Sequence, residues 1–270
     1  MKADHYVAAM PVEKARALFD GPVRAAAPEL AQLDRLEYDY MNGIQFFLNR
    51  MPPHPVHGHV AYLESPWALT SINQGGFWKG DLGATYGDGR LRDVLSIDIS
   101  DFFTPGILYG KAAVDCTPDQ IAAECWAQVK RGLNAANDVE LTDDMVIDWF
   151  LDPAVVFASG KPATSIEPLL INTAGCWADR PNAATTIPNL FLAADYVRCD
   201  IDLATMEGAD EAGRQAANAI LERSGSTASR VTLGTLWEPP QYDAAKNADE
   251  QLYKAGQPNA LDVMPAAVPA

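Results

Sequence analysis

The residues best suited to chemistry lie in one stretch, 187–221, which reads IPNLFLAADYVRCDIDLATMEGADEAGRQAANAIL. Its first part is an apolar run with the length of a buried strand, and this run ends at the carboxylate of Asp195. In open α/β folds, ligands bind at the carboxyl edge of the sheet, where an acid accepts hydrogen bonds from ribose-type hydroxyl groups. We therefore expect Asp195 to bind a ligand, the alternative being that it caps a turn.

The helix predicted after this strand begins near Thr205 or Met206, and its first two turns carry Glu207, Asp210 and Glu211. Unpaired N–H groups make a helix N-terminus a positive pole that suits an anion or an electron-rich carbonyl oxygen. The acids would repel a phosphate dianion, whereas the pyrimidine carbonyl of a flavin needs only one or two backbone donors. The pattern favours a neutral ring, unless the acids merely complement the helix dipole.

A strand and a helix must position these residues. The strand is predicted over 187–194, and the helix is predicted to end near Ser224 and Gly225. One side of the helix carries Ala209, Ala212, Gly213, Ala216, Ala217 and Ile220. Such small residues allow close approach to a sheet or another helix, so we expect this helix to be central in its domain.

The rest of the chain predicts a mixed α/β (α+β) protein. A strand is expected at 5–10 and a helix from Glu13, with weaker helical character at 30–36. Further strands are predicted at 40–48, 59–63, 67–73 and 93–99. An amphipathic helix is predicted over 118–133, a second helical stretch from near Thr142, and a short strand at LDPAVVF.

Composition excludes several classes of protein. The 270 residues are 48% hydrophobic and 21% charged, which suffices for a sizeable core in one large domain or two smaller ones. The 20 basic and 36 acidic residues give a net charge of −16, which opposes a nucleic-acid partner because phosphate contacts need clustered Lys and Arg. No apolar run approaches the roughly 20 residues that cross a bilayer, and no signal peptide is recognisable, so we expect a cytoplasmic location.

Cysteines and histidines give little sign of a metal site. The scattered cysteines are Cys116, Cys125, Cys176 and Cys199. Their spacing favours reduced thiols over a disulfide scaffold. His54, His57 and His59 could ligate a metal, but no acidic or cysteine partner lies nearby in sequence, which favours a polar loop that enters a strand. No metal site is predicted.

NLFLAADY followed by IDLATMEGADEAGRQAANAIL resembles the C-terminal flavin motif of the phytoene desaturase, hydroxysqualene dehydroxylase and amine oxidase superfamily. The usual form is NLFLAGDY, so Ala194 replaces a glycine, which could tighten the backbone approach to the cofactor. ADHYVAAMPVEKARALF, SPWALTSINQ, DVLSIDISDFFTPG and PLLINTAGCWADRP also look like segments of this family, so the resemblance covers roughly 3–221. Tyr196, Arg198 and Asp202, between the motif halves, could line the site or simply turn the chain.

The resemblance implies FAD as the cofactor. Asp195 would contact its ribityl or pyrophosphate part, and the backbone of Thr205, Met206 and Glu207 would face the isoalloxazine C2 carbonyl. Trp177 would lie near the flavin or substrate cavity, or equally would anchor the core under its loop. The catalytic side chains stay unknown, because the flavin itself carries the redox chemistry.

The implied fold is a partial two-dinucleotide-binding-type FAD oxidoreductase. Residues 1–20 would be a fragment of the FAD domain and 21–170 a sheet-rich substrate-binding domain. Residues 171–225 would supply the C-terminal strand and helix of the FAD domain, and 226–270 an irregular tail.

One departure from the family dominates. No GxGxxG occurs in the sequence, although the family places this fingerprint near its N-terminus to hold the ADP pyrophosphate. The chain also enters its first strand directly after Met1, Lys2 and Ala3. We therefore expect a fragment, a split subunit or a truncated chain whose partner is a missing N-terminal FAD-binding half. Negligible tight FAD binding by the chain alone is predicted.

Two classes of function stay open. As part of an enzyme, the chain would help an FAD-dependent oxidoreductase take hydride from a small apolar substrate, such as an isoprenoid, which stretches like IQFFL and SPWAL suit. Amines are the alternative substrates, and a lipid substrate would make peripheral membrane contact reasonable. As a non-enzymatic binding or assembly module, the chain would hold a partner or lipid without redox chemistry. A phosphate enzyme is disfavoured because no glycine-rich loop with Lys and Ser or Thr occurs.

Overall fold

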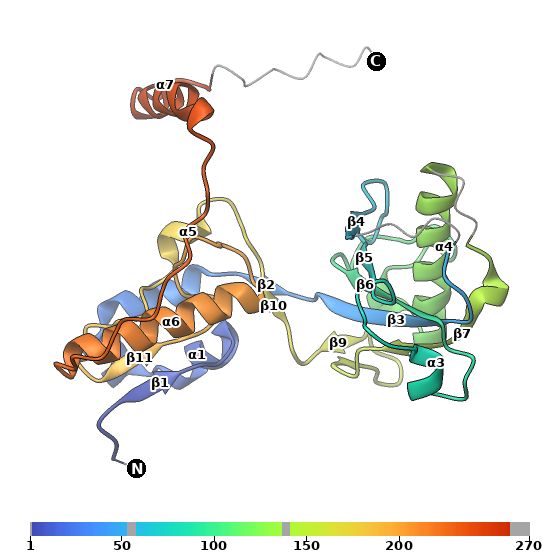
Figure 1. Ribbon diagram of the computed structural model, residues 1–270, viewed down its shortest axis with the longest axis horizontal. Helices are drawn as coiled ribbons and strands as arrows, with labels where there is room; N and C mark the ends of the chain where they lie inside the picture. The colour runs from blue at the N-terminus through green and yellow to red at the C-terminus, as the bar shows by residue number, and fades with distance from the viewer. Residues whose placement is uncertain (1, 53–57, 137–140, 260–270) are drawn as a thin grey trace.

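The computed structural model describes residues 2–52, 58–136 and 141–259, and shows two lobes joined by a narrow waist (Figure 1). Each lobe has its own hydrophobic core. The waist is a two-stranded antiparallel ladder between β2 (Tyr38–Asp39) and β10 (Leu169–Leu170). The predicted mixed α/β class is confirmed.

The first lobe is built on two parallel strands that are far apart in sequence. β1 (Tyr6–Ala8) pairs with β11 (Leu190–Leu192). Helix α6 (Met206–Arg223) packs on β11. The remaining helices of this lobe are α1 (Val12–Leu18), α2 (Gly21–Ala26), the 3-10 helix η1 (Pro28–Arg35) and α5 (Cys176–Asp179).

The core of the first lobe draws on three distant parts of the chain. Phe191 of β11 and Ala212 of α6 pack in one cluster with Leu30 and Leu33 of η1. The small residues predicted along the helix serve this packing, because Ala212 and Ala216 are buried against β11. The domain boundary predicted after residue 20 would cut through this cluster.

The two edges of the parallel pair differ. On the far side of β11, Leu192 N–H donates to the Ala183 carbonyl at 2.8 Å, and Ala184 forms a bridge with Phe191. Among the described residues β1 has β11 as its only strand neighbour, and Val7 is 48% exposed. Tyr6 N–H and the Ala8 carbonyl are bonded to the β11 segment, so the backbone of Val7 faces outward.

The second lobe is a five-stranded antiparallel sheet in the order β4-β5-β6-β3-β7. Its strands are β4 (His59–Ala61), β5 (Thr70–Asn73), β6 (Asp93–Ile99), β3 (Asn42–Leu48) and β7 (Val146–Leu151). Helix α4 (Pro118–Ala136) shares a core with one face, where alternate residues of β3 and β6 are buried. Short elements complete the lobe: α3 (Leu82–Thr85), the 3-10 turns η2 (Ala113–Asp115) and η3 (Asp143–Met145), β8 (Val155–Val156) and β9 (Thr164–Ser165).

Two sequence predictions were wrong. The helix expected near Thr142 is only the turn η3, and the chain then enters β7, because this segment pairs with β3 and tertiary pairing overrides local propensity. The tail expected to be irregular contains the helix α7 (Asp243–Lys254), preceded by the turn η4 (Pro240–Tyr242). His54 and His57 lie outside the described residues.

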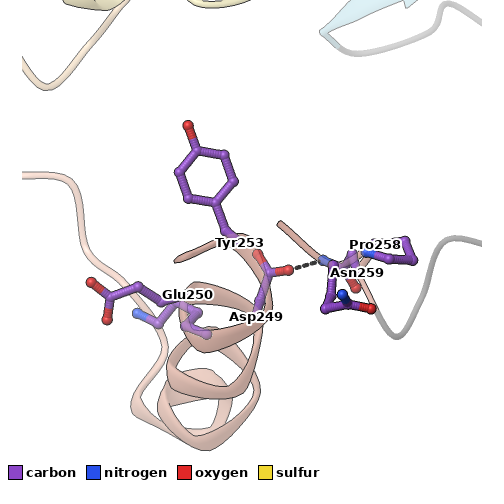
Figure 2. A pocket seen from close by; sticks show the side chains of 7 residues that line it. Asp249, Glu250, Tyr253, Pro258 and Asn259 are labelled. Atoms are coloured by element: carbon purple, nitrogen blue, oxygen red, sulfur yellow. Dashed lines mark hydrogen bonds between the residues drawn. The ribbon is translucent and has the colours of Figure 1, made fainter. Parts of the chain in front are cut away.

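The C-terminal segment first runs back along α6. Asn218 and Val231 exchange two hydrogen bonds of 2.8 and 2.7 Å, and the Arg214 guanidinium donates to the Thr232 carbonyl at 3.1 Å. Beyond Gly234 the chain leaves the helix, and α7 stands apart from both lobes in Figure 1. The chain then turns back, so that Asn259 hydrogen-bonds Asp249 beside a hollow on α7 (Figure 2).

Two further observations bear on the predicted class of protein. Within the described ranges, no helix has both the length and the apolar content needed to cross a bilayer. Every cysteine is a free thiol and is buried, in agreement with the predicted reduced state.

Candidate functional site

The carboxyl ends of β1 and β11 meet at one edge of the first lobe. The two strands run parallel, and Ala193 N–H donates to the Ala8 carbonyl at 2.9 Å just before they end. Glu13 follows β1 across the turn at Pro11, and Asp195 follows β11. We call these two strand ends, with the loop 196–205 and the start of α6, the carboxyl edge.

Asp195 lies half-buried at this edge, as predicted from its position after a buried strand. Burial raises the pKa of its carboxyl group, the charge of Arg180 lowers that pKa, and the charge of Glu13 raises it further. A carboxylate held in such surroundings accepts hydrogen bonds readily from a ligand that excludes water.

Arg180 organises the edge, and sequence reasoning missed it. Its side chain is 0% exposed. Its guanidinium donates at 2.8 Å both to the main-chain carbonyl of Asp195 and to Asn172 Oδ1, and its Nε lies 3.1 Å from Asp202 Oδ1. One side chain therefore ties β11, the segment before α5 and the loop before α6 together. The sequence showed Arg180 only as part of the segment PLLINTAGCWADRP, and nothing in that segment indicates that its side chain is buried.

The loop between the motif halves is held tightly. Asp202 has a φ of 41°, a left-handed conformation that is costly for a residue with a side chain, and the Asn172 side chain donates to its carbonyl. Tyr196 is fully buried and its hydroxyl has no hydrogen-bond partner among the described residues, while Arg198 lies 4.7 Å from the Trp177 ring centroid. Asp202 thus turns the chain, and a role of Tyr196 or Arg198 in lining the site stays a prediction.

The start of α6 keeps donors free for a ligand. Thr205 is the N-cap, and its hydroxyl accepts from Gly208 N–H at 3.1 Å. Met206 is 85% exposed, and Glu207 beside it is also exposed. Within the described chain, the N–H groups of Met206 and Glu207 have no protein acceptor. They are the donors that an electron-rich carbonyl oxygen could use.

The predicted acidic cluster at this helix end is partly neutralised. Glu211 is buried and accepts a 3.1 Å hydrogen bond from Gly234 N–H, because helical spacing turns it toward the C-terminal segment. Asp210 forms an ion pair with Arg214 at 2.7 Å. Glu207 alone is left beside the first turn without a paired charge among the described residues.

The remaining predicted residues lie close by. Ala194 is buried at the end of the β11 segment. Trp177, on α5, is 44% exposed and its indole N–H donates to the Cys199 carbonyl at 3.2 Å. It is therefore not a core anchor, and its contact with a flavin or substrate stays a prediction. No group of three His, Cys, Asp or Glu residues in the described ranges could hold a metal ion.

A family model described as flavin containing amine oxidoreductase matches residues 1–221. The chain belongs to this family. The match covers both lobes and ends within α6, so the segment along α6 and α7 lies outside it. The family identifies FAD as the cofactor and places the chain among the FAD-dependent oxidoreductases. No curated protein matches the sequence.

The carboxyl edge fits a bound flavin on its own evidence. Glu13 Oε2 and the Tyr196 hydroxyl are buried polar atoms without a protein partner, which is uncommon unless a ligand or water satisfies them. The free N–H groups of Met206 and Glu207 lie at the same edge. The Glu13 carboxylate, the Tyr196 hydroxyl and these N–H groups therefore have hydrogen-bonding capacity that a ligand can use.

Proposed function

We propose that this chain is the C-terminal part of an FAD-dependent oxidoreductase and acts with a complementary FAD-binding half that carries the GxGxxG fingerprint. The observation that carries the proposal is the parallel pair of β1 and β11, which has one open edge among the described residues and is followed by the residues that we propose face the flavin. In this proposal residues 1–20 and 171–225 are parts of the FAD domain, and most of 21–170 binds substrate.

The open edge of β1 supports a partner strand. Parallel sheets normally have more strands and are covered on both faces, and two strands alone are marginal in stability. The outward-facing backbone of Val7 would bond to a strand added beside β1, as in other cases of strand addition. The complementary half would supply this strand together with the glycine-rich loop absent from the sequence.

The chain's own residues would bind and orient the cofactor. Bound flavin supplies the acceptor for a hydride from the substrate. Asp195 would accept hydrogen bonds from flavin hydroxyl groups, and the N–H groups of Met206 and Glu207 would donate to the C2 carbonyl. Ala194, in place of the usual glycine, would tighten the backbone approach to the cofactor, and Trp177 would lie near the flavin or substrate.

An apolar, isoprenoid-like substrate is supported by the sheet face turned away from α4. Strand register places Gln45, Ser96, Ile72 and Phe150 in one row on this face. Phe150 is exposed, and the Gln45 side chain donates to Ser96 at 3.3 Å. The row thus sets the apolar side chains of Ile72 and Phe150 beside the polar Gln45 and Ser96, and the apolar pair would contact a lipid-like molecule.

An amine is the second candidate substrate, and Asp98 favours it. Asp98 lies on the same open face, opposite Gly43 and Thr70, and its carboxylate makes no hydrogen bond within the described chain. Burial by neighbouring strands raises the pKa of its carboxyl group, while His59 lowers it. An ammonium group could pair with this carboxylate.

The test is to isolate the native complex through a tag on this chain, sequence any stoichiometric partner and measure its flavin. We expect a partner with GxGxxG and one FAD per complex. Anaerobic bleaching of that flavin by a polyisoprenoid, and not by a panel of amines, would support the apolar substrate. Bleaching by amines, with a raised KM in Asp98→Asn, would support the second candidate. A complex that binds a partner or lipid without flavin would instead support the non-enzymatic module.

A further inference from the structure

Glu13 is a half-buried acid, and one oxygen of its carboxylate has no hydrogen-bond partner among the described residues. It lies in the first turn of α1, and its side chain is only 11% exposed. Its Oε2 atom has no hydrogen-bond partner, and its Oε1 atom lies 3.7 Å from Lys14 Nζ, too far for a hydrogen bond. A carboxylate removed from water in this way is unfavourable unless something donates to it.

Local structure does not explain this burial. An acid in the first turn complements the helix dipole, but it can do so while exposed to solvent. The N–H groups of Lys14 and Ala15 are both bonded to the Pro11 carbonyl, so they are not free to hold the Glu13 side chain. Local structure therefore leaves one oxygen of the Glu13 carboxylate without a donor among the described residues.

Glu13 shares the carboxyl edge with Asp195. Each acid follows the end of one of two adjacent parallel strands, and the charge of Glu13 is close enough to raise the pKa of Asp195. Arg180, a buried cation beside Asp195, is already engaged by the Asp195 carbonyl, Asn172 and Asp202. The edge thus presents two carboxyl groups, and the Arg180 side chain is not free to pair with them.

The ligand that suits such an edge is neutral and rich in hydroxyl groups. A phosphate would be repelled by both acids, and the described residues contain no metal-binding group. We infer that Glu13 is a second carboxyl ligand of the cofactor edge and binds, together with Asp195, the hydroxyl groups of the flavin ribityl chain. This inference rests on the proposed flavin function and adds a residue to its site.

The experiment compares riboflavin with lumiflavin, which has the same ring system but no ribityl chain. Saturation-transfer NMR on the full chain detects the weak binding expected of half a site. Riboflavin should bind more tightly than lumiflavin, and Glu13→Gln should raise the Kd for riboflavin about tenfold, the effect of losing one charge-assisted hydrogen bond, without changing that for lumiflavin. Glu222→Gln removes the same charge on exposed surface at the other end of α6 and should change neither Kd.

Thermal unfolding separates a binding role from a structural one. Because Glu13 Oε2 has no hydrogen-bond partner to lose and glutamine has nearly the same size, Glu13→Gln should leave the Tm unchanged, whereas a structural role requires a fall. Equal binding of riboflavin and lumiflavin to the unsubstituted chain, or an unchanged riboflavin Kd in Glu13→Gln, would overturn the inference and leave the flavin function intact. If neither riboflavin nor lumiflavin shows saturation transfer, the inference about Glu13 is also wrong. The proposed function would stand, because it requires flavin binding only in the complex with the partner.

Discussion

At the scale of residues, the carboxyl edge contains polar groups that lack partners within the described chain. Burial raises the pKa of the Asp195 carboxyl group, Glu13 Oε2 has no hydrogen-bond partner, and Tyr196 is buried without a partner for its hydroxyl. Groups of this kind persist in proteins where function needs them. Arg180 compensates by fixing the segments that carry them.

The burial of Asp195 predicts that its effect on the free energy of unfolding depends on pH. Because burial raises the pKa of its carboxyl group in the folded state, the ionised form destabilises the fold, and folding favours the protonated form. Asp195→Asn should raise the free energy of unfolding at pH 7. This gain should vanish well below the ordinary carboxyl pKa of about 3.9, where the acid is protonated in both states.

Urea unfolding of both proteins at the two pH values measures this difference. The same substitution should lower flavin retention by the complex, because asparagine is a weaker acceptor for hydroxyl groups. Lower stability of Asp195→Asn at pH 7, together with unchanged flavin content, would remove Asp195 from the site.

At the scale of elements, periodicity and composition predicted the framework well. The strand expected at 93–99 is β6, and the helix expected from Pro118 is α4, because both patterns agree with the final packing. β7 was mistaken for a helix because its identity depends on pairing with β3, a segment about a hundred residues away. Arg180 and Glu13 were missed for the same reason, since their roles come from contacts between distant segments.

The start of α6 requires glycine at position 208. A Cβ atom there would lie 2.7 Å from the Leu203 carbonyl oxygen, a backbone atom that cannot move away cheaply. Gly208→Ala should destabilise the fold by about 1–3 kcal/mol through this overpacking. It should also displace the loop that leads to the free N–H groups of Met206 and Glu207.

Gly213 provides the matched control on the same helix. A Cβ atom at this position meets no atom within 4 Å, so Gly213→Ala gains helix propensity without a clash. It should stabilise the fold by roughly 0.5–1 kcal/mol. Chemical denaturation of both variants tests the pair, and equal effects of the two substitutions would contradict the packing described for the start of α6.

At the scale of the whole molecule, the first lobe has a sheet that another strand could extend. The backbone N–H and carbonyl groups of Val7 face away from β11 and can bond to a strand of another chain. Open sheet edges of this kind promote association between chains. The isolated chain should therefore self-associate in sedimentation velocity. Val7→Lys should reduce this association, because charge on an edge strand opposes pairing.

Val156→Lys is the corresponding control, because Val156 is an exposed strand residue of the second lobe. It should leave self-association unchanged. A chain that is monomeric without substitution and unfolds cooperatively would argue against an incomplete sheet and for the non-enzymatic module.

The central claim is that this chain holds half of a flavin site. Calorimetric titration of FAD tests it most directly, first into the purified chain and then into the complex with its GxGxxG-bearing partner. We predict no submicromolar binding by the chain alone and stoichiometric tight binding by the complex. Submicromolar affinity of the chain alone for FAD would contradict the claim.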